Sequence, residues 1–186
     1  LKTFGALYNV KVKGWENVDE NSAAVFGVKH SSDVDFLLAR HIFPEKARIF
    51  ATQRMFLPVI SYLMHAARFV PITNALKNSQ PNITRTDYAT FNKFYRLLES
   101  GQWVVYAPEA MCFPNSIGER IFPEFIMKAS ELGVNSYLVG VAYSNRGSPW
   151  LYWLPGCRGI EVTIEPYDAR NKNKEQVKAE MRNALG

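Results

Sequence analysis

Short apolar runs and amphipathic segments alternate along the whole chain. The apolar runs have the length and the β-branched or aromatic content of strands, and the segments between them repeat apolar residues at three- and four-residue spacing, as helices do. We predict strands at 23–28, 47–52, 68–73, 102–106, 137–143 and 160–164, and helices at 32–40, 53–67, 87–100, 125–132 and 174–185. This alternation predicts an α/β fold with a central sheet covered by helices on both faces.

Single residues predict where several of these elements begin and end. Ser32, followed three positions later by Asp35, resembles a capping box and predicts a helix start before an apolar run. Pro58 either lies early in the next helix or kinks it, because proline cannot donate an intrahelical hydrogen bond. Gly101 supplies a C-terminal stop for the helix before it. Pro71 cannot donate to a sheet ladder, so strand 68–73 is predicted at a sheet edge.

Length and composition are those of one globular domain, which we assign to residues 1–186. With 47% hydrophobic and 21% charged residues, the chain can bury a sizeable core and lacks the composition of a disordered protein. Its two cysteines form no CxxC pair, which argues against a zinc finger or a disulfide framework. No apolar run reaches about 18 residues, so no membrane-spanning helix is predicted. The chain begins at Leu1, which leaves open a preceding membrane-anchoring segment.

The charge balance favours an anionic partner. The chain has 22 basic and 17 acidic residues, a net charge of +5. Such an excess suits nucleic acid, a phosphate-bearing ligand or an anionic membrane surface. The basic residues form no dense Lys/Arg block, so we expect a membrane surface and no nucleic acid.

The stretch 28-VKHSSDVDFLLA-39 carries the candidate chemistry. His30 and Asp35 are five residues apart, a step that turns by about 500° on a continuous helix and would separate the two side chains. A helix start at Ser32 leaves His30 outside the helix and Asp35 in its first turn, so the two can meet. Asp35 would then fix the imidazole tautomer, and the other ring nitrogen could take a proton from a hydroxyl.

Purely structural roles for the same residues stay open. A histidine beside a helix start is often only a solvated or capping residue, and Asp35 alone could be a cap partner. A metal site built from His30, Asp33, Asp35 and His41 lacks regular ligand spacing, so no metal and no cofactor are predicted. A serine hydrolase would need an elbow such as GxSxG, which does not occur here.

The segment 30-HSSDVD-35 resembles HxSxxD, the signature of the glycerophospholipid acyltransferases, the 1-acylglycerol-3-phosphate acyltransferase family. The family's usual order is a glycine-containing segment, an apolar strand, the histidine motif and a leucine-containing helix. Gly14, the run at 23–28 and the leucines at 37 and 38 follow that order. The later strand 139-VGVAY-143 loosely resembles another family segment. The resemblance extends from Gly14 to Tyr143.

A second family motif is a strand that ends in Phe-Pro-Glu-Gly, and 104-VVYAPEA-110 is similar to it. The triplets at 43–45 and 122–124 are closer in letters, but neither directly follows a β-rich run. Glu109 is therefore the expected motif glutamate, with a role in acceptor binding or in shaping the loop. Ala110 takes the place of the motif glycine.

Other positions depart from the family pattern. Lys29 stands where Asn is common, and Asn74 takes the place of an arginine thought to grip the acceptor phosphate. Arg54 and Arg68 are nearby candidates to replace that arginine, although each could be ordinary surface charge. Lysophosphatidate, another lysophospholipid, a glycolipid and an aminolipid all stay open as acceptor.

The resemblance implies a mixed, mostly parallel sheet and acyl transfer from acyl-CoA or acyl carrier protein to a hydroxyl of a lysolipid. His30 would be the general base and Asp35 its orienting acid, with backbone N–H groups near the turn as candidate oxyanion donors. The implied substrate-binding positions are Ser32, Arg54, Arg68, Asn74, Glu109 and Ala110.

The resemblance also implies a membrane-associated protein, peripheral on the cytoplasmic face. The apolar run at 55–64 is a candidate acyl-groove wall or interfacial surface, although core packing is the expectation for most of its residues. Two other functions stay open: a lipid-binding scaffold that lost turnover, and an acyl-thioester hydrolase.

Overall fold

The computed structural model describes residues 9–31, 35–52, 55–72, 86–109, 121–143 and 159–185. Its strands are β1 (Val10–Lys13), β2 (Ala24–Val28), β3 (Ala47–Thr52), β4 (Phe69–Ile72), β5 (Trp103–Tyr106), β6 (Asn135–Tyr143) and β7 (Ile160–Tyr167). Its helices are the 3-10 turn η1 (Trp15–Asn17), α2 (Asp35–Ile42), α3 (Pro58–Ala66), α4 (Thr86–Glu99), α5 (Glu124–Glu131) and α6 (Lys174–Leu185).

The strands form one mixed sheet in the order β1-β7-β6-β2-β5-β3-β4. Neighbours from β6 to β4 are parallel, and the antiparallel pair is β6 with β7. β5 is buried along its whole length and β2 is buried up to Gly27, as central parallel strands covered on both faces should be. The predicted α/β fold with a mostly parallel sheet is confirmed, and β4 lies at the edge where Pro71 predicted it.

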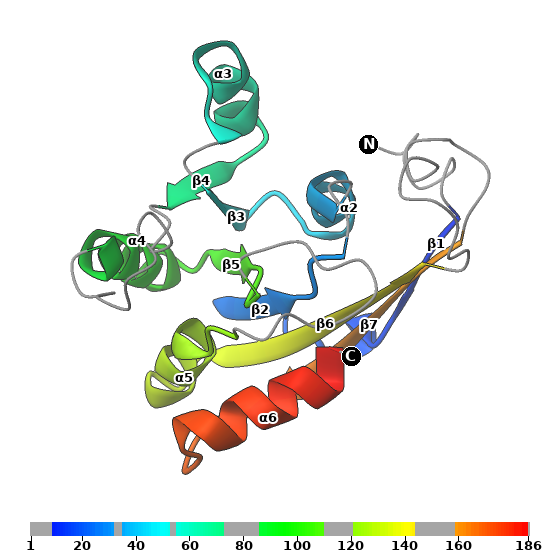
Figure 1. Ribbon diagram of the computed structural model, residues 1–186, viewed down its shortest axis with the longest axis vertical. Helices are drawn as coiled ribbons and strands as arrows, with labels where there is room; N and C mark the ends of the chain where they lie inside the picture. Colours follow the sequence, from blue (N-terminus) through cyan, green and yellow to red (C-terminus); the bar gives the residue numbers. More distant parts are fainter. Residues whose placement is uncertain are drawn as a thin grey trace.

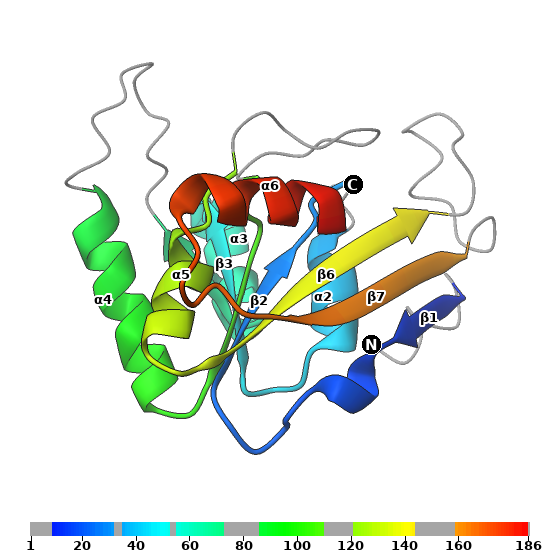
Figure 2. The ribbon, with the colours of Figure 1, turned by 90° about the horizontal axis from the view of Figure 1, so that it is seen from below.

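Helices cover both faces of the sheet (Figure 1). Phe94 of α4, Ile126 of α5 and Met181 of α6 belong to one core layer. Leu38 of α2 and Met64 of α3 belong to the layer on the other face. Figure 2 shows α6 lying across the long strand β6. The chain thus leaves β2 through α2 on one face and β5 through α5 on the other.

Gly14 shows why a glycine stands before the first buried strand. Its φ is +82°, a conformation that side-chain-bearing residues rarely adopt. A Cβ there would also lie 2.1 Å from the carbonyl oxygen of Ile164. Glycine therefore lets the chain pass tightly against β7 before entering β2.

The predicted helix 53–67 is wrong at its start, because α3 begins at Pro58. Leu57 is extended, with φ −65° and ψ 152°, since a residue before proline is pushed out of the helical region. The expectation of core packing for the run at 55–64 is also wrong for four of its members. Among the described side chains of this run Met64 is buried, whereas Met55, Leu57, Tyr62 and Leu63 are exposed.

Candidate active site

Three neighbouring strands bring polar side chains to one edge of the sheet. His30 follows β2, Glu109 follows β5, and Tyr143 ends β6. These strands are parallel, so their carboxyl ends meet at the same edge. Because the connections after β2 and β5 run over opposite faces, this edge is a topological switch point, where α/β proteins usually bind ligands.

His30 and Asp35 face each other across the turn before α2. The imidazole Nδ1 lies 3.1 Å from Oδ2 of Asp35, the first residue of that helix. An ionised carboxylate only accepts hydrogen bonds, so Nδ1 carries the proton and Nε2 of the neutral ring keeps a lone pair. The His30 side chain is 30% exposed, which leaves the ring within reach of a ligand.

Asp35 is buried, and its carboxylate is held from several sides. Oδ2 also accepts a hydrogen bond from the backbone N–H of Ser31 at 2.6 Å. Oδ1 accepts one from the hydroxyl of Tyr143, which comes from the end of β6. A buried carboxylate needs such donors, because losing water without them is costly. These donors also fix the rotamer that presents Oδ2 to His30.

The backbone of the turn is tied down at three successive N–H groups. That of Lys29 donates to the carbonyl of Val139 at 3.0 Å, and that of His30 donates to Oε2 of Glu109 at 3.0 Å. The third is the Ser31 N–H described above. All three have protein acceptors, so the expectation that N–H groups of this turn serve as oxyanion donors is wrong for residues 29–31.

Glu109 is buried, and the packing of its loop explains how it reaches His30. A Cβ on Gly27 would lie 3.2 Å from Cγ of Pro108 and 3.0 Å from Cδ1 of Ile126. Gly27 therefore gives the loop after β5 room to pack against β2. The hydrogen bond to the His30 backbone supports the loop-shaping role, one of the two expected for Glu109, and acceptor binding stays a prediction.

The structure does not bring Arg68 to this edge. Arg68 precedes β4, at the amino ends of the parallel strands, and pairs with Glu45 at 2.9 Å. The other candidates, Ser32, Arg54, Asn74 and Ala110, lie outside the described residues. No group of three or more possible metal ligands occurs in the described part of the chain.

Tyr143 is the functional candidate that sequence reasoning missed. It sits at the end of a predicted apolar strand, where an aromatic residue is ordinary. Its partner Asp35 is 108 residues away in the chain. No local spacing could have linked the two, and only the pairing of β6 with β2 does so.

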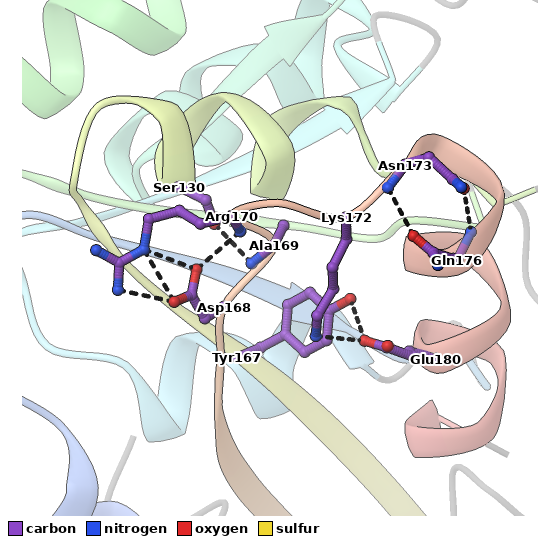
Figure 3. Close-up of polar contacts among 9 residues, drawn as sticks. All are labelled: Ser130, Tyr167, Asp168, Ala169, Arg170, Lys172, Asn173, Gln176 and Glu180. Carbon is purple, nitrogen blue, oxygen red and sulfur yellow. Dashed lines mark hydrogen bonds and ion pairs between the residues drawn. The ribbon is translucent and has the colours of Figure 1, made fainter.

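A cavity of about 280 Å³ lies at the opposite edge, where β6 begins and β7 ends. Asn135, Ser136, Asp168 and Arg170 are among its lining residues. Figure 3 shows the polar contacts of this region, in which Asp168 binds Arg170 and the Ala169 N–H donates to Ser130 Oγ at 3.0 Å. Asn135 donates to Ser22 and Ser136 to the carbonyl of Val134, so these polar groups all have protein partners. The cavity lies roughly 30 Å from the His30 edge by the length of the nine-residue strand β6.

The chain is an α/β protein with a His–Asp pair at the switch point of its sheet. Its family is given by the match of its sequence to a family model. Residues 9–144 match the Acyltransferase family, and the chain belongs to it. The match spans the His30 turn, Glu109 and Tyr143. A comparison with curated proteins found no match.

Among solved structures, the chain resembles the 1-acyl-sn-glycerophosphate (LPA) acyltransferase PlsC of Thermotoga maritima. The TM-score is 0.68 and the sequence identity 18%, over 99% of this chain and 72% of that one. At this identity the likeness concerns the fold. No helix among the described residues is long and apolar enough to cross a membrane.

Proposed function

We propose that the protein transfers a fatty acyl group from an acyl thioester, acyl-CoA or acyl carrier protein, to a hydroxyl of a lysophospholipid or related lipid. The observation that carries the proposal is the His30–Asp35 pair at the switch point, with Nδ1 facing the carboxylate. Membership of the Acyltransferase family supports this reaction class. We place the protein peripherally on the cytoplasmic face of a membrane, where its lipid acceptor lies.

In the proposed reaction His30 is the general base. Nε2 takes the acceptor's hydroxyl proton as that oxygen attacks the thioester carbonyl. The tetrahedral intermediate then collapses, the C–S bond breaks, and the imidazolium returns its proton to the leaving thiolate. An ester and a free thiol are formed, and no covalent acyl-enzyme is needed.

The neighbouring residues position this base. Asp35 holds the tautomer and stabilises the imidazolium that forms. Tyr143 holds Asp35, and Glu109 holds the His30 backbone, so both act through the pair rather than on the substrate. Ser32, Arg54, Asn74 and Ala110, which the family resemblance implies as substrate-binding positions, are the residues proposed to bind the acceptor's phosphate or other headgroup.

The test is a panel of lysolipid acceptors, with thiol release and new esters measured together by absorbance and mass spectrometry. The wild type should form an ester with at least one acceptor and release one thiol for each. His30→Ala should lower the rate by about 10²–10⁴-fold while the circular dichroism stays unchanged. His41→Ala on α2 is the matched control and should keep the wild-type rate.

The same panel separates the alternatives. Thiol release without acceptor and without a new lipid would establish an acyl-thioester hydrolase. Lipid binding with no thiol release would establish a scaffold. Unchanged turnover in His30→Ala would refute the proposed base.

A further inference from the structure

Among the described residues of α3, the exposed side chains are apolar except for that of His65. Leu57 is 56% exposed, Tyr62 80% and Leu63 65%. Together with Met55 these are four of the seven large hydrophobic side chains that are exposed among the described residues. Single exposed apolar residues are normal, but four within nine consecutive positions form a patch that calls for a partner.

The place of α3 in the fold leaves this patch facing outward. The helix lies beyond the edge strand β4, at one end of the molecule (Figure 1). Met64 is its buried contact with the sheet layer that contains Phe69. Met55 and Leu57 come after the carboxyl end of β3, at the same sheet edge as His30. The start of this patch therefore lies at the sheet edge that carries the candidate active site.

The charge of the sequence segment that contains α3 favours an anionic partner. Residues 46–86 contain no acidic residue and have six basic ones, Lys46, Arg48, Arg54, Arg68, Lys77 and Arg85. The rest of the chain has 16 basic and 17 acidic residues, so the whole positive excess of the protein belongs to the segment that contains α3. The described members of this set, Lys46, Arg48 and Arg68, lie toward the amino ends of β3 and β4, where Arg68 pairs with Glu45.

We propose that α3, with Met55 and Leu57, is the surface that docks the protein on an anionic lipid bilayer. An apolar helix face in a basic segment is the pattern of interfacial helices, whose side chains enter the headgroup boundary while cations meet anionic lipids. The inference deepens the proposed function, because it names the surface that brings the His30 edge to the membrane.

The test measures binding to vesicles in the absence of substrate. Vesicles of phosphatidylcholine with about one third phosphatidylglycerol should bind the wild type, and added salt or pure phosphatidylcholine should weaken the binding. The double variant Leu57→Ser with Tyr62→Ser should partition at least about tenfold more weakly. The matched control replaces Leu132, 54% exposed, and Tyr88, 75% exposed, by serine and should bind like the wild type.

A second readout asks whether α3 enters the bilayer. Tyr62→Trp should be quenched by brominated lipids, and Tyr88→Trp on α4 should not. Equal vesicle binding by the two double variants, or equal quenching, would overturn the proposal. The proposal would also be overturned if the wild type were a dimer and the α3 variant a monomer that still binds vesicles. The patch would then contact a second copy of the chain.

The outcome for docking is separable from the outcome for catalysis. If docking is correct, the α3 variant should lose turnover on acceptor in vesicles but keep it on a water-soluble short-chain acceptor. Vesicle binding by a wild type that turns over no acceptor would leave the docking surface standing and refute the proposed function.

Discussion

The two ends of β6 carry polar networks that are built in different ways. At the carboxyl end, His30 and Glu109 are 79 residues apart in the chain, and Asp35 and Tyr143 are 108 apart. The carboxylates of Asp35 and Glu109 are both buried. At the amino end, Asp168 binds Arg170 two residues on, and Glu180 accepts from Lys172 eight residues away. The second network is partly exposed and largely local (Figure 3).

The difference separates a positioned site from a surface cluster. Exposed ion pairs contribute little to the free energy of unfolding, even where Arg170 hydrogen bonds bring the pKa of Asp168 to about 2. Buried carboxylates are costly to keep, so each must be matched by donors. At the carboxyl edge the two buried carboxylates hold the ring and the backbone of His30 in place. General-base catalysis needs a histidine positioned in this way.

The largest effect that would test this contrast is expected from Glu109→Ala. It leaves the part-buried N–H of His30 without its acceptor, which should cost about 1–3 kcal/mol in the free energy of unfolding. Displacing the imidazole should lower kcat by about 10²-fold. Urea unfolding and initial rates measure both. Glu109→Gln keeps an oxygen acceptor and should recover most of the activity; a wild-type rate in Glu109→Ala would contradict the positioning role.

A finer comparison uses two tyrosines that each donate to a carboxylate at opposite ends of the sheet. Tyr143→Phe removes the hydroxyl that donates to Asp35 Oδ1 and should lower kcat about tenfold, a loss of ~1.4 kcal/mol, with KM unchanged. Tyr167→Phe removes the 2.7 Å bond to Glu180 and should leave kcat unchanged. Nitrogen NMR of the His30 ring should show a mixed tautomer in Tyr143→Phe alone. Equal kcat losses in the two variants would contradict the contrast.

The smallest effect is expected at the start of α6. The Gln176 N–H donates to the side chain of Asn173, and the Asn173 N–H donates to that of Gln176, both at 2.9 Å, a reciprocal cap. Asn173→Ala should lower the free energy of unfolding by about 1 kcal/mol, and acyl transfer should not change. Thermal unfolding measures this loss, and Asn173→Asp, which keeps an acceptor, is the control. An activity loss in Asn173→Ala would show that the two networks are coupled.

Sequence reasoning anticipated the architecture because the elements have strong local signals. Gly101 and Gly133, with φ of +71° and +70°, end α4 and α5 as C-terminal stops do. Reasoning failed where tertiary context decides burial. The run at 55–64 has the composition of a core segment, yet it follows the next-to-edge strand, and among the described elements a helix at that end has a neighbour on only one side.

The sequence by itself determined the strands from β2 to β7, the helices apart from the start of α3, and the five-residue spacing that lets His30 and Asp35 meet across a helix start. Those features depend on neighbours within a few residues. Only the tertiary structure decided that Glu109 holds the His30 backbone, that Tyr143 holds Asp35, and that Arg68 lies at the other end of the sheet. Strand order places these residues, and strand order depends on packing between segments far apart in the chain.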